Sequence, residues 1–595
     1  MHVSTAPARK DLEETLLATL SADAPWSLIE HFANENLIRE SGSEDERGAA
    51  QYISDQLSRF GVEHTVHTPE LFLSVPVRSR LVAGGREFHA KSPAFSISTP
   101  PDGLSGEAIF IPDFNASRGA DLFDFIPATE DVEVAGKIVV VNGFGGPPPV
   151  SFFEERGAIG QIYLNPGENI HWGICTTIWG APDLDNYRSQ PHTPVLAINQ
   201  SDGEALLAQL AAGETQVTLH TELREGWVEC PCIDAVIRGN EEAERFVLVH
   251  GHLDSWDIGI GDNAVGNATL LELARIFQAQ RDQLARSLRV VWWTGHSTGR
   301  YGASTWFADR FGLELARHCI AQVNIDSPGC RWADTYTDVT MMTEASEFAC
   351  QAIEDASGIP ATGARPHQAG DYSFNNIGLS AFFMLLSSMS AELREEKGYY
   401  GVGGCGGNIA WHTEDDRLEI ADQEVLMRDL RVYTAALQRV LNNPLHPYDF
   451  GALAQEFAGT LARYSEAAGE QADFGPAHCA LSGLQEALGE LYGAAAGLAG
   501  RGVGDAAVRA FNDAQLALAR ELVPINFTRK GRFRTEPAVP IPQLPDLAAA
   551  LTVAGTSGHL RNVTKTHLLR GVNRVAWCFE QATAIARRAA AEISG

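Results

Sequence analysis

The stretch that decides the fold of this chain is "RFVLVHGHLDSWDIGIGDNAVGNATLLELA", residues 245–274. Its unbroken apolar run, residues 246–249, is typical of a strand that is buried on both faces of a sheet. Its last part, residues 267–274, has the apolar spacing of an amphipathic helix. Two histidines and several aspartates lie between them. The order of strand, polar turn and helix predicts one unit of an α/β fold.

The same alternation continues through residues 229–440. The runs "LRVVWWTG", "CIAQVNID" and "SAFFMLL" predict further strands, and "STWFADRFGLELA", "SEFACQAIEDASG" and residues 422–441 predict helices. Continuous apolar strands separated by amphipathic helices favour a mainly parallel sheet with helices on both faces. In such sheets ligands bind beyond the carboxyl ends of the strands.

Four groups of polar residues stand at these expected strand ends or in adjoining loops. They are His252 with Asp254 and Asp262, then His296 with Ser297, then Asp326, and finally His412. A single histidine or aspartate at a strand end is more often a hydrogen-bonded loop residue than a ligand. Four groups at one edge of a sheet favour a metal site with nitrogen and oxygen ligands. The carboxylate of Asp254 is a candidate for orienting the imidazole of His252.

The rest of the chain divides into regions of different character. Residues 11–61 predict two helices, and "SRLVAGGREFHA" predicts a hairpin around Gly84-Gly85. Short strands separated by proline and glycine fill residues 100–228, and they include a β-α-β unit. The glycines at 143–146 do not predict a phosphate loop, because the three prolines that follow lack the N–H groups that bind phosphate. The last 145 residues are rich in alanine and leucine and predict helices.

The composition and the charge of the chain indicate which partners and which cellular location to expect. With 45 Lys and Arg against 76 Asp and Glu, the formal charge of −31 disfavours binding to nucleic acid or to an anionic membrane. The N-terminus "MHVSTAPARKDLEETLLATLSAD" lacks the apolar core of a signal peptide. Nine dispersed cysteines fit reduced thiols. We therefore expect a cytoplasmic protein that does not span a membrane.

The order of these motifs resembles the co-catalytic zinc metallopeptidases of the aminopeptidase and glutamate carboxypeptidase family, which includes the transferrin receptor. The most specific motif is "GHLDSWDIGIGDNAVGNATLLELAR", and "VAGKIVVV" with "RGAIGQIYL" is similar to the inserted protease-associated domain of that family. The resemblance implies four regions. Residues 1–99 and 229–445 would form the metallopeptidase-like domain, 100–228 the protease-associated-like domain, and 446–595 a helical dimerisation-like domain.

The resemblance also implies a set of metal ligands. By position, His252, Asp262 and Asp326 would bind zinc, with Asp262 bridging two ions and His412 completing the set of the other ion. The family normally has two adjacent glutamates after the strand "LRVVWWTG". The first is the general base and the second is a zinc ligand. This chain has His296 and Ser297 at those two positions.

The change from two glutamates to His296-Ser297 has different consequences at each position. A serine hydroxyl brings neither the negative charge nor the low pKa of a carboxylate ligand, so the metal that relied on position 297 would be weak or lost. Neutral imidazole is both a good ligand and a competent base near pH 7, so His296 could serve in either role. His250, two residues before His252, and His367 are candidates for compensation. We expect one firmly bound zinc or other divalent transition metal.

The leading hypothesis is a metal-dependent hydrolase that cleaves a peptide bond or another small amide, as aminopeptidases and carboxypeptidases do. The loops at 366–374 and 400–411 would shape its pocket, and the candidate substrate contacts are His367, Asp371, Tyr372 and Trp411. One alternative is a non-hydrolytic enzyme, a lyase or an acyl transferase. The other is an inactive binding protein like the transferrin receptor. Drift to inactivity usually erodes several ligands together, and here five of the expected site residues remain. The resemblance further implies a homodimer through the C-terminal helices.

Overall fold

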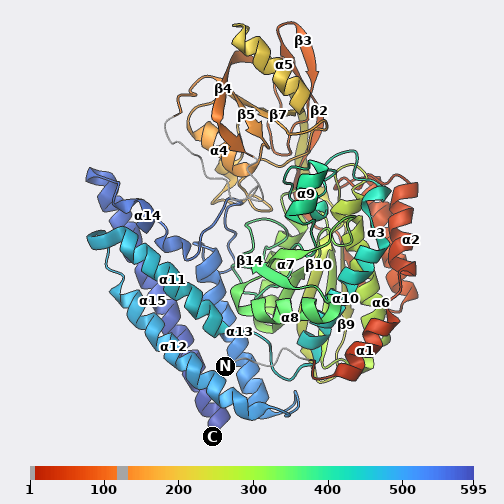
Figure 1. The fold of residues 1–595 in the computed structure, drawn as a ribbon, viewed down its shortest axis with the longest axis vertical. Helices are drawn as coiled ribbons and strands as arrows, with labels where there is room; N and C mark the ends of the chain where they lie inside the picture. The colour runs from red at the N-terminus through yellow and green to blue at the C-terminus, as the bar shows by residue number, and fades with distance from the viewer. Residues whose placement is uncertain (1–6, 117–131) are drawn as a thin grey trace.

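The computed structural model describes residues 7–116 and 132–595 of the protein, with the side chains of 113–116 and 338 left out. Figure 1 shows three parts: an α/β body, a smaller sheet-containing part above it, and a group of long helices along one side. The class predicted from the sequence, α/β with flanking helices, is confirmed.

The sheet of the α/β body has five strands in the order β1-β9-β11-β10-β12. Their bounds are β1 Glu63–His67, β9 Cys232–Ile237, β10 Glu242–His252, β11 Arg286–Trp293 and β12 Cys319–Asn324. Strand β10 pairs in parallel with both β11 and β12, whereas β9 runs antiparallel to β11 and to β1. The parallel strands are those that the apolar runs predict. The sheet is therefore parallel at the three strands that carry the polar groups and antiparallel beyond them.

Helices cover both faces of this sheet. Their bounds are α1 Lys10–Thr19, α2 Asp23–Asn34, α3 Glu44–Arg59, α6 Val265–Ala279, α7 Gly302–His318, α8 Ser346–Ser357, α9 Ala391–Lys397 and α10 Gln423–Asn442. The N-terminal region holds three helices where the sequence predicts two. Pro25 gives the reason, because it has no N–H for a helix that continues from α1 but is tolerated in the first turn of a new one.

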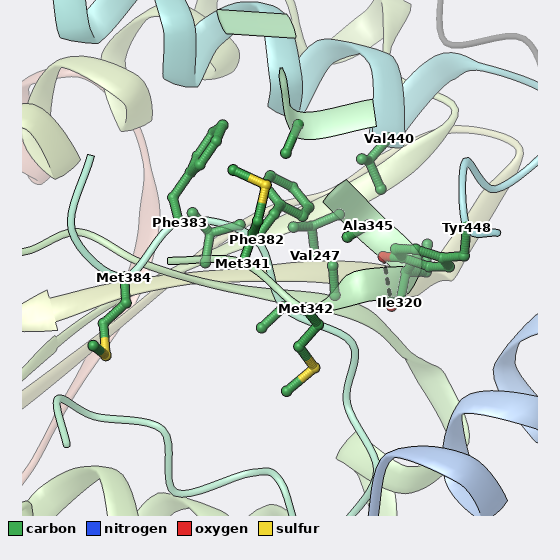
Figure 2. Packing of buried hydrophobic residues seen from close by; sticks show 14 of the residues in the cluster. Val247, Ile320, Met341, Met342, Ala345, Phe382, Phe383, Met384, Val440 and Tyr448 are labelled. Atoms are coloured by element: carbon green, nitrogen blue, oxygen red, sulfur yellow. Dashed lines mark hydrogen bonds between the residues drawn. The ribbon is translucent and has the colours of Figure 1, made fainter. Parts of the chain in front are cut away.

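The core of the body lies between the sheet and these helices (Figure 2). Val247 of β10, Ile320 of β12 and Val440 of α10 meet there, all at most 1% exposed. The hydroxyl of Tyr448, from the segment that leads into the C-terminal helices, donates a hydrogen bond to the carbonyl of Ile320 at 3.1 Å. Every residue of β11 is buried, and its last four, residues 290–293, form the continuous apolar run expected of a strand that is covered on both faces.

The segment "SAFFMLL", residues 380–386, differs from its prediction. It pairs with β12 and with the residues just after β12 through isolated bridges, Gln322 to Ala381 and Asp326 to Leu385. Phe383 has a φ of 61°, which interrupts the extended backbone that a regular ladder needs. A short separate pair, β13 Tyr336–Thr340 with β14 Ala361–Ala364, lies nearby in the chain.

The upper part in Figure 1 is built on a seven-stranded sheet in the order β3-β2-β8-β4-β5-β6-β7. The bounds of its strands and helices are β2 Glu70–Ala83, β3 Arg86–His89, β4 Leu104–Ala116, β5 Ile138–Gly143, α4 Pro147–Glu155, β6 Gly160–Leu164, β7 Val195–Ile198, α5 Gln200–Ala211 and β8 Gln216–Glu229. Strands β5, β6 and β7 are parallel, as the predicted β-α-β unit requires, and β2 and β3 form the predicted hairpin. The three prolines after the glycines form the first turn of α4, where a missing N–H costs nothing.

Strand β2 belongs to both the upper part and the body. Its first half packs on the body, where Leu71 and Leu73 contact the cluster of Trp293 and Phe307. Its second half packs in the upper sheet, where Leu81 and Ala83 are buried. The strands of the upper sheet therefore begin before residue 100, which is where the sequence predicts that the inserted region starts.

The C-terminal region is helical, as its apolar spacing predicts. The bounds are α11 Phe450–Ala468, α12 Gly475–Ala495, α13 Ala506–Phe527, α14 Ala550–Val553 and α15 Gly558–Ser594. In Figure 1 helix α15 runs alongside α12 and ends at the C-terminus. Within residues 7–116 and 132–595, no helix combines the length and the apolar run needed to cross a bilayer.

Candidate metal centre

The carboxyl ends of the three parallel strands bring the predicted site residues to one edge of the sheet. His252 is the last residue of β10, His296 lies three residues after the end of β11, and Asp326 lies two residues after the end of β12. Because neighbouring parallel strands end at the same edge, residues that are far apart in the chain become neighbours there.

Asp262 lies between two histidines at this edge. One carboxylate oxygen, Oδ1, is 2.8 Å from His252 Nε2, and the other, Oδ2, is 3.1 Å from His412 Nε2. Asp326 Oδ1 is 3.7 Å from the same His252 nitrogen. The four residues predicted as ligands are therefore brought together, with a carboxylate in the position of a bridge between two imidazoles.

The electrostatics of these groups are strongly coupled. Burial lowers the pKa of His252, but Asp326 and Asp262 outweigh it and raise that pKa well above its usual value. Burial raises the pKa of Asp262, but hydrogen bonds to His252 and His412 hold it well below its usual range. A buried cluster of negative carboxylates around imidazole nitrogens attracts a cation of any kind, a proton or a metal ion.

The donor atoms fit a transition metal. His252, His296 and Asp326 each offer a ligand atom, and these atoms lie within 4.8 Å of one another. The Nδ1–H of His252 donates to the carbonyl of Asp254 at 2.8 Å, which leaves Nε2 as the nitrogen with a free lone pair. That Nε2 is buried and faces the carboxylate oxygens of Asp262 and Asp326, at 2.8 and 3.7 Å. Two imidazole nitrogens and carboxylate oxygen are ligands that suit zinc.

The contact made by Asp254 differs from the predicted one. Its backbone carbonyl, not its carboxylate, accepts the hydrogen bond from His252. The carboxylate instead accepts the backbone N–H groups of His296 and Ser297, at 3.0 and 2.9 Å. The strand-end sequence cannot distinguish these two uses of one residue. Asp254 thus joins the ends of β10 and β11 and fixes the backbone of the His296-Ser297 turn.

His296 is held by a buried carboxylate. Its Nδ1 lies 3.0 Å from Asp371 Oδ2, and its ring stacks on the ring of His252 with centroids 3.9 Å apart. Burial raises the pKa of Asp371, but the imidazole of His296 outweighs this and lowers it. Asp371 is fully buried, so it contacts His296 and not the solvent side of the site. With Nδ1 taken by a carboxylate, the other ring nitrogen of His296 is left to bind a proton or a cation.

The half of the site around His412 is less complete. The only group of three ligand atoms found in the described parts of the chain is that of His252, His296 and Asp326. His412 contacts Asp262, and the backbone N–H of Ser297 is taken by Asp254. Position 297, where the family resemblance implies a glutamate ligand, offers only a buried hydroxyl.

His412 is positioned by residues from the upper part of the molecule. Its Nδ1–H donates to the carbonyl of Trp172 at 2.9 Å, and its ring stacks on Trp411 with centroids 3.8 Å apart. The neighbouring His171 donates to the carbonyl of Trp411, and burial lowers its pKa to about 3. No feature of the sequence around Trp172 marks it as a partner of His412.

A further residue that the sequence did not reveal is Asp416. Its carboxylate accepts the N–H groups of Gly261 and Asp262, at 2.6 and 2.9 Å, and so holds the turn that presents the bridging carboxylate. Burial raises the pKa of Asp416 to about 7. The only available signal is that it follows the predicted ligand His412 by four residues, in "HTEDD".

A cavity opens beside His412, between the upper part and the body. Phe144, His171 and Trp172 line it from the upper part, and Trp411 and His412 line it from the body. Trp411 therefore lies where a substrate contact is expected.

The remaining predicted contacts lie elsewhere. Tyr372 packs in the body core and does not line this cavity. His367 is half-buried beside the lining residue Gln368. His250 is not a compensating ligand, because its two ring nitrogens contact Trp293 and Gln322 in the core. Burial lowers the pKa of His250 to about 4.

Comparison with known families agrees with this geometry. Residues 233–435 match the profile described as Peptidase family M28. This range contains every residue of the cluster at the sheet edge.

Curated relatives match over about half of the chain. Carboxypeptidase Q of Mus musculus is 27% identical over 286 residues, which cover 45% of this chain and 58% of that protein. Leucine aminopeptidase 2 of Arthroderma otae is 25% identical, and the match covers 47% of this chain and 52% of that protein. The chain thus spans a little over half the length of the curated relatives that it matches.

Solved structures share the fold of the body. A Peptidase M28 precursor from Shewanella amazonensis has a TM-score of 0.54 at 18% identity and covers 73% of this chain and 95% of its own. A zinc aminopeptidase from Bacillus subtilis has a TM-score of 0.52 at 17% identity, with 71% and 96% covered. At these identities the likeness is one of fold.

Proposed function

Because residues 233–435 match the profile described as Peptidase family M28, we propose that this protein is a metal-dependent hydrolase of a peptide bond or another small amide. The names of its relatives, a carboxypeptidase and an aminopeptidase, support a peptide or a small peptide-like amide as the substrate. The observation that carries the proposal is the buried meeting of His252, Asp262, Asp326 and His412 at one edge of the sheet.

The residues divide into holders of the metal and a group that moves a proton. His252, Asp262 and Asp326 would hold one zinc or similar divalent ion, because both carboxylates face His252 Nε2, at 2.8 and 3.7 Å. When bound, the metal would polarise the scissile carbonyl as a Lewis acid. His296 would take the proton from the attacking water, since its free ring nitrogen faces neither Asp371 nor the backbone. Asp371 would stabilise the imidazolium that results, as a carboxylate behind a catalytic histidine does.

The chain would retain one firmly bound metal. The charge and chelation that a glutamate at position 297 would supply are missing, and His412 with Asp262 gives only two protein ligands for a second ion. The cavity beside His412 would bind the substrate, with the rings of Trp411 and Phe144 excluding water from the reacting carbonyl.

Two measurements test the proposal. Metal analysis of protein purified without added metal should give about one tightly held equivalent per chain, because His252, Asp262 and Asp326 would supply three ligands to one ion. Two tightly held equivalents would overturn the single-metal site. Hydrolysis of dipeptides and N-acyl amino acids in ¹⁸O-labelled water should place one solvent oxygen in the acid product. A product without solvent oxygen would indicate a lyase or acyl transferase instead, and a metal-free protein without turnover would indicate a binding protein.

The wider organisation of the protein is proposed on the same resemblance. Residues 1–99 and 229–445 would form the metallopeptidase-like domain, 100–228 a protease-associated-like domain, and 446–595 a dimerisation-like domain. The apolar residues exposed on α15 support a homodimer. A cytoplasmic location is supported by nine cysteines that are all free thiols.

A further inference from the structure

Arg300 lies in the turn between the His296-Ser297 pair and helix α7. Its backbone has a φ of 46°, and its carbonyl accepts the N–H of Gly180 at 2.7 Å. The side chain lines the same cavity as His412 and Trp411. The guanidinium lies over the ring of Tyr301, 4.6 Å from its centroid, and that ring in turn packs against His296. The turn that carries His296 therefore also directs a cation into the substrate cavity.

This guanidinium is buried without a polar partner. Arg300 is 6% exposed, and its Nε is among the buried atoms that lack a hydrogen-bond partner. Over residues 7–116 and 132–595, no hydrogen bond or ion pair is formed by its side chain. Among the described residues, five other arginines are also buried, and each of them donates to a carboxylate or to backbone carbonyls: Arg39, Arg286, Arg289, Arg439 and Arg520. Burying a charge without a partner is costly, so Arg300 is the exception that requires a partner from outside the chain.

The cavity is built to receive an anion at this point. Its lining contains no aspartate or glutamate, although the whole chain carries a formal charge of −31. Apart from Arg300 the walls are largely apolar and aromatic, with Phe144, Trp172 and Trp411 among them. A guanidinium offers paired N–H groups whose geometry matches a carboxylate, and the contact strengthens where water is excluded.

We propose that Arg300 binds a carboxylate of the substrate and so makes the protein selective for acidic substrates at this subsite. The inference rests on the proposed function, because it takes the cavity beside His412 as the substrate cavity. The carboxylate could be the C-terminal group of a peptide or an N-acyl amino acid, or the side chain of an acidic residue. Both sources present the same group to Arg300, and the experiment separates them.

Three ligands of nearly equal size provide the test, with binding to the metal-loaded protein measured by titration calorimetry. N-acetyl-glutamine carries only a C-terminal carboxylate, its isomer N-acetyl-isoglutamine carries only a side-chain carboxylate, and N-acetyl-glutaminamide carries neither. One of the two acids should bind about 10- to 100-fold more tightly than the neutral amide, as expected for a charge-assisted pair in a dry site. Preference for N-acetyl-glutamine would identify a C-terminal carboxylate, and preference for N-acetyl-isoglutamine an acidic side chain.

The variant Arg300→Leu should abolish this preference and leave binding of the neutral amide within about 2-fold. Arg300→Gln, which keeps hydrogen-bonding groups without the charge, serves if the leucine variant does not fold. The matched control is Arg331→Leu, which removes an arginine that also lies over the ring of the next residue, Trp332, but does not line this cavity. The control should keep the full preference for the acid.

Two outcomes would overturn the inference: equal binding of all three ligands, or a preference for an acid that survives in both Arg300 variants. Kinetics on a substrate that carries the preferred carboxylate gives an independent readout, in which KM rises by about 10- to 100-fold in Arg300→Leu while kcat changes less. Acid-selective binding without any hydrolysis would contradict the proposed hydrolase activity but would still support the carboxylate subsite at Arg300.

Discussion

Asp262 connects the two halves of the candidate metal site, because each of its carboxylate oxygens faces a different imidazole. The halves are unequal. The half around His252 can draw on Asp326 and His296, whereas the half around His412 has no third ligand nearby in the described residues. At the scale of single residues, we therefore expect position 297 to decide how many metal ions the protein holds.

Restoring a carboxylate at this position should restore the second ion. We expect Ser297→Glu to raise the content of tightly held metal from about one to about two equivalents per chain, because glutamate supplies both charge and an oxygen ligand. Metal analysis after dialysis against a weak chelator measures this content. Ser297→Ala is the matched control and should remain at about one equivalent. A glutamate variant that also stays at one would show that position 297 does not face the second site.

His296 and Asp371 should act as a pair. Asp371→Asn keeps the size of the side chain but removes the charge behind the imidazole, and we expect kcat to fall by about 10- to 100-fold with the metal content unchanged. His296→Ala should lower kcat further, by about 10²- to 10⁴-fold, because it removes the proton acceptor itself. Steady-state kinetics on a dipeptide, together with metal analysis of each variant, provides both readouts. Wild-type turnover in His296→Ala would remove that residue from the mechanism.

At the scale of secondary-structure elements, much of the site could be predicted because it lies at the ends of strands. The apolar runs of β10, β11 and β12 identify them as buried parallel strands, and their carboxyl ends then share one edge. The partners that complete the site could not be predicted in the same way. Trp172 holds His412 across 240 residues of chain, and such a contact leaves no local pattern in the sequence. The pairing of Asp371 with His296 was missed for the same reason.

The segment that leads into α8 contains a buried acid whose ionisation should affect stability. Glu344, in the turn before the helix, is 2% exposed and accepts a hydrogen bond from the Ser380 hydroxyl at 2.7 Å. Burial raises the pKa of Glu344 to about 7. Because the folded protein holds this proton more tightly than the unfolded chain, the contribution to stability is complete below pH 4.5 and is lost as the pH rises through 7.

Replacing Glu344 by glutamine should remove this pH dependence. Between pH 5.5 and pH 8 the free energy of unfolding of the wild type should fall by about 2 kcal/mol relative to that of Glu344→Gln, since glutamine cannot ionise. Urea unfolding at the two pH values measures the difference. Glu354→Gln, which removes an exposed glutamate from α8, is the control and should follow the wild type. Parallel pH profiles for wild type and Glu344→Gln would contradict the prediction.

At the scale of the whole molecule, the cavity beside His412 is lined by two parts of the chain that are separate in the sequence. The upper part supplies Trp172 and Phe144, and the body supplies Trp411, His412 and Arg300. Strand β2 connects the two parts physically, since its halves pack in different cores. The geometry of the cavity therefore depends on how the upper sheet is seated on the body, and the sequence of neither part specifies the cavity by itself.

Helix α15 has an exposed apolar surface. Four large apolar side chains are exposed on it, Leu560, Val563, Leu569 and Trp577, with 60%, 49%, 63% and 61% of their surface exposed. On a helix with 3.6 residues per turn, all four lie within about 180° of one another around the axis, on one half of the helix surface. An exposed apolar strip of this kind is typical of an interface, and the family resemblance implies a homodimer at this region.

We expect Trp577→Glu to weaken self-association by about 30-fold or more, because a large aromatic side chain near the centre of an interface commonly contributes about 2 kcal/mol or more. Light scattering over a dilution series should show wild-type dimers that persist to lower concentration than those of the variant. Leu184→Glu is the control, because Leu184 is 91% exposed but lies outside α15, between β6 and β7 in the chain. If the tryptophan variant dissociates no more readily than this control, or if the wild type is monomeric at all concentrations, the apolar face of α15 does not join two copies of the chain. The site chemistry would then have to be complete within a single chain, which is consistent with the location of every candidate ligand in one body.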